Sequence, residues 1–361
     1  MTTAFPLLRL PYLVLMPILE QMEFMERIAL SILSKRARMF LKLLKIKCKH
    51  INMILLDNRI TMRVFFENSK EHTRISLNYY YYIAWWPGPL SPMDYVLPIM
   101  DVTHCNSIKQ FIVGRVSEYD TLPLLAKLPK INEVIVEESP LQKVLKIVLP
   151  ICSAVTIFYP ALKPEDLREI FKRNYDAVTV REYRFDFMPY HDMKLSLNTR
   201  FSLNDWRFTN AKTLKLDGLG FKVKDLNRYF KLWMKKKCND RLEYLRVTTG
   251  RWVKKIKINK LLKGLNAVQI PIRTDKTFRV LGNIKQFNSE DSNEEITSEF
   301  DITRADGRQA TIRISDYGTV HFYVWPESTN DATIIEPNQS SFTRKFSRLS
   351  SFYNSFIERF K

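Results

Sequence analysis

Glycine is scarce in this sequence, with only nine glycines in 361 residues. A loop that brings its backbone close to a phosphate needs glycines, because only glycine leaves enough space and adopts left-handed conformations without strain. The best candidate, Gly218-Leu219-Gly220, has Val223 where a dinucleotide-binding loop carries its third glycine. The sequence therefore predicts no nucleotide cofactor, and no other cofactor is indicated.

Cysteine and histidine are also few, with four cysteines and five histidines. The cysteines have no paired spacing, so neither a zinc site nor a disulfide framework is expected. The sequence contains no zinc-protease histidine pair, no Walker loop and no Gly-x-Ser-x-Gly elbow. We therefore expect a protein that is not an enzyme and that works with reduced thiols in the cytoplasm or the nucleus. The four cysteines are Cys48, Cys105, Cys152 and Cys238.

Long apolar runs are missing as well. No stretch approaches the roughly eighteen apolar residues that a membrane span requires. The apolar N-terminal run lacks a basic leader and is interrupted by Arg9 and two prolines, so it is not typical of a signal peptide. The sequence predicts no membrane span.

Acidic residues are in short supply: 38 Asp and Glu stand against 57 Lys and Arg, a net charge of +19. Such a charge suits a nucleic acid, an anionic membrane surface or an acidic protein as partner. Residues 235–237 and 251–260 are basic runs that could contact phosphates, although ordinary solvated surface has the same composition. A basic nucleic-acid-binding protein is the alternative hypothesis for function, and net charge alone only permits it.

The first 46 residues carry a concentrated apolar pattern. Pro11 suits the first position of a helix, and apolar side chains follow it at helical spacing. Two more short helical patterns come next, and Pro17 predicts a kink or restart in the first of them. Helices this short do not bury so many large side chains among themselves, so an interaction surface is expected here.

This segment resembles an F-box of the nematode type. The resemblance rests on Leu10-Pro11, Val14-Leu15, Ile18-Leu19 and Ser34-Lys35-Arg36. It implies a three-helix domain over residues 1–46 that docks on the Skp adaptor, and through it on a cullin, in an SCF-type ubiquitin ligase. The alternative is a helical hairpin buried in the main core. The residues expected to contact the adaptor are Leu10, Pro11, Val14, Leu15, Ile18, Leu19, Ile28 and Ser34.

Residues 47–129 read as a β-rich connecting region. Two β-rich runs, 51–56 and 60–66, flank Asp57-Asn58-Arg59 and predict a hairpin, and 74–82 predicts a further strand. Aromatic residues gather at 79–86, either as a binding surface or as strand side chains packed on the core. The second interpretation is favoured, because aromatic residues are common in strands.

Residues 130–267 alternate between strand and helix patterns. Strands are expected at 134–136, 154–158, 177–180, 213–216 and 242–247, with helices at 141–149, 164–173 and 223–237. Units that recur every twenty to thirty-odd residues suggest a leucine-rich-repeat-like solenoid. An ordinary α/β sheet is equally compatible with this irregular spacing.

A second resemblance covers roughly residues 180–250. The segments 213–216, 224–234 and 241–247 are similar to the F-box-associated type 2 domain, with Leu226-Asn227 and Trp233 in the helix and Leu242-Glu243-Tyr244-Leu245 in the strand. The resemblance implies that this region selects a target protein. It supplies no individual contact residue, so the substrate-binding residues are unknown.

The chain ends in an antiparallel β meander over residues 268–327 and a polar, amphipathic tail over 328–361. Asp306-Gly307 and Asp316-Tyr317-Gly318 provide the turns. The fold class expected for the whole chain is α/β, with α+β character at the two ends. The expected function is that of a non-catalytic substrate-recognition subunit of an SCF-type ubiquitin ligase, whose target the sequence does not name.

Overall fold

The computed structural model describes thirteen parts of the chain. It divides the chain into two compact units, Met1–Trp325 and Pro326–Lys361, and every element below belongs to the first. The described residues are 7–44, 48–57, 59–66, 72–78, 92–116, 128–137, 146, 148–159, 164–182, 203–218, 221–248, 256–274 and 294–326.

The chain begins with the three expected helices, preceded by a 3-10 turn. A capping box, in which Glu23 and Glu26 satisfy each other's backbone N–H groups, starts the second helix, and Ser34 caps the third. Pro17 lies inside the first helix, which continues past it, so the predicted restart is wrong. The elements are η1 (Leu7–Arg9), α1 (Tyr12–Gln21), α2 (Phe24–Leu33) and α3 (Lys35–Leu43).

Within the described residues, thirteen strands then form one sheet, in the order β10-β11-β12-β13-β9-β8-β7-β6-β5-β4-β1-β2-β3. The fold class expected from the sequence is confirmed. The strands are β1 (Cys48–Asp57), β2 (Arg59–Phe66), β3 (His72–Asn78), β4 (Ile108–Val116), β5 (Ile131–Val136), β6 (Cys152–Tyr159), β7 (Ala177–Glu182), β8 (Thr213–Asp217), β9 (Tyr244–Thr248), β10 (Val268–Ile270), β11 (Ile296–Thr303), β12 (Gln309–Ser315) and β13 (Thr319–Val324).

The central strands are parallel and follow one another across the sheet in chain order. After the predicted β1–β2 hairpin and β3, β1 pairs in parallel with β4, and each later strand pairs with the next as far as β9. From β4 on, these strands begin at residues 108, 131, 152, 177, 213 and 244, which is an irregular period. The leucine-rich-repeat-like description therefore stays a prediction.

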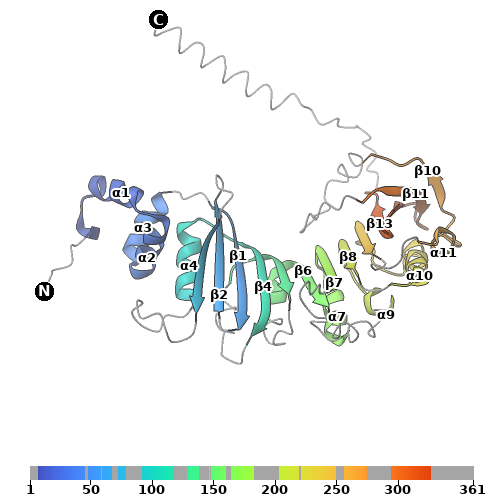
Figure 1. The fold of residues 1–361 in the computed structure, drawn as a ribbon, viewed down its shortest axis with the longest axis horizontal. Helices are drawn as coiled ribbons and strands as arrows, with labels where there is room; N and C mark the ends of the chain where they lie inside the picture. The colour runs from blue at the N-terminus through green and yellow to red at the C-terminus, as the bar shows by residue number, and fades with distance from the viewer. Residues whose placement is uncertain are drawn as a thin grey trace, which may run out of the picture. The chain divides into compact units, whose positions relative to one another are not determined.

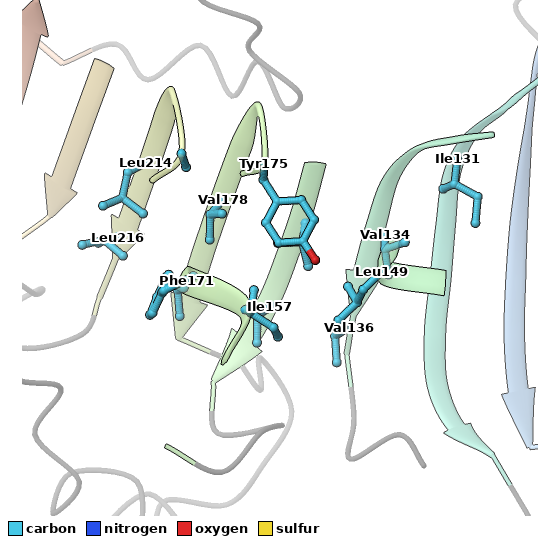
Figure 2. Close-up of a cluster of buried hydrophobic side chains, with 14 of the residues drawn as sticks. Ile131, Val134, Val136, Leu149, Ile157, Phe171, Tyr175, Val178, Leu214 and Leu216 are labelled. Carbon is cyan, nitrogen blue, oxygen red and sulfur yellow. The ribbon is translucent and has the colours of Figure 1, made fainter. Parts of the chain in front are cut away.

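Helices pack on one face of this sheet (Figure 1). Along each central strand, buried apolar side chains on this face alternate with side chains on the other face, as the pleat of a strand requires. Figure 2 shows part of the core, where Phe171 lies near Ile157 of β6 and Val178 of β7, and Leu149 lies near Val134 of β5. The other helices in the described parts of the chain are α4 (Pro92–Val102), η2 (Leu149–Ile151), α7 (Pro164–Phe171), α9 (Leu203–Trp206), α10 (Val223–Met234) and α11 (Ile258–Leu261).

The predicted C-terminal meander is present as β11, β12 and β13. Its turns contain Gly307 (φ 88°) and Gly318 (φ 73°), a conformation that favours glycine. β13 pairs antiparallel with β9, with Phe322 opposite Leu245. The meander therefore continues the central sheet, and one sheet crosses the boundaries expected near residues 130 and 268. The division of the chain into separate domains at these two boundaries stays a prediction.

The N-terminal helices are fixed on the body through α4. Helices α2 and α3 both pack on α4, and the ring of Phe24 meets that of Phe66 edge to face at 4.9 Å. The Lys42 ammonium lies 2.7 Å from the Asp101 carboxylate, and the His104 ring Nε2–H donates to the Lys42 carbonyl at 2.8 Å. These contacts hold α3 against the end of α4.

Several expectations lie partly or wholly outside the described residues. They are the aromatic cluster at 79–86, most of the helix expected at 141–149, the basic residues 251–255 and the tail from 328. Helix α4 and strand β4 were not predicted at all.

Candidate functional site

Three of the residues predicted to contact an adaptor lie in the core of the N-terminal helices. Leu15 and Leu19 of α1 are 0% exposed, and Ile28 of α2 is 2% exposed. Buried aliphatic side chains of this size each contribute about 1.5–3 kcal/mol when removed from water. In the chain by itself these three side chains hold the helices together.

The other predicted contact residues lie nearer the surface. Pro11 and Val14 are exposed, whereas Leu10 and Ile18 are half-buried. The Ser34 Oγ accepts a hydrogen bond from the Ala37 backbone N–H at 3.2 Å, so Ser34 serves as the N-cap of α3. Contact of these eight residues with the adaptor stays a prediction. The exposed positions, Pro11 and Val14, are the ones that a partner reaches without rearranging the helices.

Large apolar side chains are exposed on the same helices. Among the described residues, seven of the twelve exposed large hydrophobic side chains lie between Tyr12 and Leu43. The Tyr12 and Phe40 rings lie 6.3 Å apart, which places the start of α1 beside α3. We use the name α1–α3 face for the exposed side chains on these two helices, which are Tyr12 (52%), Leu13 (83%), Val14 (48%), Met39 (69%) and Leu43 (54%).

The residues predicted to contact the adaptor did not include Tyr12, Leu13, Met39 and Leu43. Helix α1 is apolar on nearly every side, because its sequence is YLVLMPILEQ. A helix that is apolar all round has two candidate faces, and periodicity alone cannot assign one to its own core and the other to a partner. The signal in the sequence that could have identified this surface is the number of apolar residues in α1, which exceeds what one buried face can hold.

A second region, α7 to β9, forms a firmly packed strand–helix layer. Leu226, Tyr229, Phe230 and Trp233 of α10 are fully buried, as the helical spacing predicted. The Trp233 ring meets Phe322 of β13 edge to face at 5.0 Å, and Tyr229 stacks on another buried ring at 4.2 Å. The outer side of α10 is thereby held in a fixed position on the sheet.

The opposite face of the sheet carries a continuous polar row. Each member lies opposite the next one on the neighbouring strand, across six strand pairs from β6 to β11. At the β6 end, the Thr156 hydroxyl donates to the Glu133 carboxylate at 2.7 Å, which extends the row to β5. Five members are at most 6% exposed. The polar row comprises Thr156, Thr179, Lys215, Arg246, His321, Arg313 and Glu299.

Opposite charges meet closely along the polar row. The Arg246 guanidinium lies 3.1 Å from the Glu294 carboxylate and 3.6 Å from that of Asp217. Arg313 lies 3.3 Å from Glu299. Internal pairing of this kind is what buried charges require, and it indicates that the polar row is largely a structural network.

The His321 ring occupies a defined place in this network. Burial lowers its pKa, although the neighbouring Glu294 opposes the shift. A neutral ring can accept the Tyr244 O–H at Nδ1 (2.9 Å) and donate from Nε2–H to the Glu294 carboxylate (3.3 Å). Burial alone would raise the pKa of Glu294, but hydrogen bonds from His321 and Thr319, with the Arg246 charge, lower it to about 2.

Neither a metal cluster nor a membrane helix is found in the described parts of the chain. No group of three or more His, Cys, Asp or Glu side chains there could hold a metal ion. No helix there is long and apolar enough to cross a bilayer.

Comparison with known proteins identifies two domains. The family model of the F-box domain matches residues 7–49, which span η1 to α3 and the start of β1. A family model described as F-box associated matches residues 166–247, which span most of α7 to β9. No curated protein and no solved structure matches the chain. The chain therefore carries an F-box domain followed by an F-box associated domain, the pair of domains of non-catalytic F-box proteins.

Proposed function

We propose that this protein is a substrate-recognition subunit of an SCF-type ubiquitin ligase. Its F-box would bind the Skp adaptor, and through it a cullin, by the α1–α3 face. The observation that carries this proposal is the set of exposed apolar side chains on helices that match the F-box domain. Apolar surface of this kind marks a protein interaction site.

The region from α7 onward would hold the target protein. The F-box associated match supports this assignment, because it covers strands and helices that are firmly packed and lie outside the F-box. The free cysteines of the described residues fit a place in the cytoplasm or the nucleus.

Such a subunit acts through proximity. Holding a target beside a ubiquitin-charged enzyme makes the transfer effectively intramolecular, so the receptor needs no catalytic residue of its own. The contacts of Lys42 with Asp101 and His104 support this role, because they fix the last F-box helix on the body. A fixed connection limits the positions that a bound target can take.

Affinity purification of the tagged full chain from proteasome-inhibited cells tests the proposal. We expect the Skp adaptor, a cullin and a target that accumulates under inhibition. The double variant Leu13→Asp, Val14→Asp should lose adaptor and cullin and keep the target. Recovery of nucleic acid without the adaptor would instead support a basic nucleic-acid-binding protein.

A further inference from the structure

Helix α10 carries three cations in one line on its solvent side, and Lys235 at its C-cap continues the line. Lys224, Arg228, Lys231 and Lys235 are separated by four, three and four residues, so they lie along one face of the helix. This face is opposite the buried side chains of Leu226 and Trp233. At a rise of 1.5 Å per residue the line is about 16 Å long. Lys231 is half-buried, and the other three side chains are exposed.

Helix α11 brings a second group of cations beside this line. Lys260 and Lys263 are exposed, as is Lys257 at the N-cap of α11. The Asn227 side-chain amide donates to the backbone carbonyls of Leu261 (2.6 Å) and Lys263 (3.0 Å), which holds the end of α11 against α10. We call the combined surface the basic stripe; its members are Lys224, Arg228, Lys231, Lys235, Lys257, Lys260 and Lys263.

The basic stripe is not neutralised within the described part of the chain, where none of its members forms an ion pair. Nearby charges are paired with other groups: Asp240 with Arg304 at 3.0 Å, and Lys236 with Asp306 at 3.0 Å. Like charges three and four residues apart destabilise a helix. Repulsion among these charges opposes the stability of α10, although the cations at its C-terminal end also interact favourably with the helix dipole. The polar row differs, because its Arg246 and Arg313 charges are paired.

The chemistry of the stripe favours carboxylates as its partners. Six of its seven cations are lysines, which bind anions as point charges without the bidentate geometry of arginine. The aromatic rings of α10, Tyr229, Phe230 and Trp233, are buried and offer no platform for stacking bases. An acidic peptide complements the stripe in charge and needs no stacking surface.

We propose that the basic stripe on α10 and α11 binds an acidic segment of the target protein. The identification of the partner as the target rests on the proposed function. Helix α10 lies within the F-box associated match, and α11 follows the end of that match by about ten residues. An extended segment of about five residues has the length of the line on α10, at about 3.3 Å per residue. The stripe would thus select targets by a short run of Asp and Glu.

The test uses a labelled oligoglutamate peptide and the folded full chain, with anisotropy recorded from low to high salt. The stripe variant Arg228→Gln, Lys231→Gln, Lys235→Gln is compared with the control variant Lys109→Gln, Lys130→Gln, Lys172→Gln. The control removes the same charge from exposed positions outside the stripe. The stripe variant should bind about tenfold more weakly because up to three exposed ion pairs are lost, and the control should bind like wild type.

Two outcomes would overturn this inference. One is equal peptide affinity of the stripe and control variants, because peptide binding would then depend on the net charge of the chain and not on the stripe. The other is a short DNA duplex that binds more tightly than the peptide and is lost in the stripe variant, which would make nucleic acid the occupant. Adaptor affinity is measured separately: its absence in the wild-type chain would refute the ligase role, whereas the peptide titration decides the role of the stripe.

Discussion

At the scale of single residues, Cys48 and Cys105 are neighbouring thiols joined by a hydrogen bond. The parallel register of β1 and β4 places Ile51 opposite Ile108, and the two cysteines lie three residues before these positions. A hydrogen bond from the Cys48 thiol lowers the pKa of Cys105 to about 6, whereas burial raises the pKa values of Cys152 and Cys238 to about 12. Cys105 is therefore the most acidic of the four thiols, whereas hydrogen bonding to Cys105 and burial raise the pKa of Cys48.

This difference predicts the order of alkylation. With limiting iodoacetamide at neutral pH, Cys105 should react first and Cys152 and Cys238 last, because the thiolate is the nucleophile. Cys48→Ala removes the hydrogen-bond donor and should slow labelling of Cys105. Peptide mass spectrometry measures the labelling rate at each site. Equal rates at all four cysteines would contradict the lowered pKa of Cys105.

Glu294 gives a residue-scale prediction for stability. Glu294→Gln keeps the shape of the side chain but removes the charge beside Arg246, and should lower the free energy of unfolding at neutral pH by about 1–3 kcal/mol. Because its folded pKa is lowered to about 2, the ionised carboxylate stabilises the fold above its unfolded pKa of about 4.3. That contribution is lost as the pH falls toward the folded value.

Urea unfolding of wild type and variant, at neutral and acidic pH, measures this effect. The difference in the free energy of unfolding between wild type and Glu294→Gln should be constant above the pKa that Glu294 has in the unfolded chain. It should become smaller below that pKa. Glu295→Gln is the matched control, since the neighbouring Glu295 is exposed. A control that destabilises as much as Glu294→Gln would rule out a specific role for the network.

At the scale of elements, the start of α3 depends on Ser34. Ser34→Ala removes the cap on the Ala37 N–H and should cost about 1 kcal/mol of stability, whereas Ser34→Asp keeps an acceptor there and should preserve most of it. Thermal unfolding compares the three proteins. If Ser34→Ala unfolds like wild type but binds the adaptor weakly, Ser34 acts by contact rather than as a cap.

Elements with strong periodicity were predictable from the sequence, and elements with mixed signals were not. The apolar face of α10 and the turns of the meander were identified because spacing and turn residues agree there. Helix α4 was not predicted, because it begins at Pro92, directly after a proline-rich segment, and contains Pro98, and an interior proline ordinarily breaks a helix. The burial of Leu15 and exposure of Leu13 depend on how α1 packs against its neighbours, which local sequence does not specify.

At the scale of the whole molecule, the account separates two surfaces with different partners. The α1–α3 face is apolar and belongs to the F-box, and the basic stripe is charged and belongs to the region of the F-box associated match and the helix after it. Binding at the first should depend weakly on salt, because apolar burial is its source. Binding at the second should weaken steeply as salt screens the charges.

The most direct measurement of the central claim is the affinity of the full chain for the purified Skp adaptor by calorimetry. Leu13→Asp, Val14→Asp places charge on the α1–α3 face and should weaken binding by at least about tenfold, since loss of one anchor alone costs about 2 kcal/mol. Val268→Asp, at an apolar position of β10 that is also 63% exposed, should bind like wild type. A wild-type chain that does not bind the adaptor, or a double variant that binds it equally well, would contradict the account.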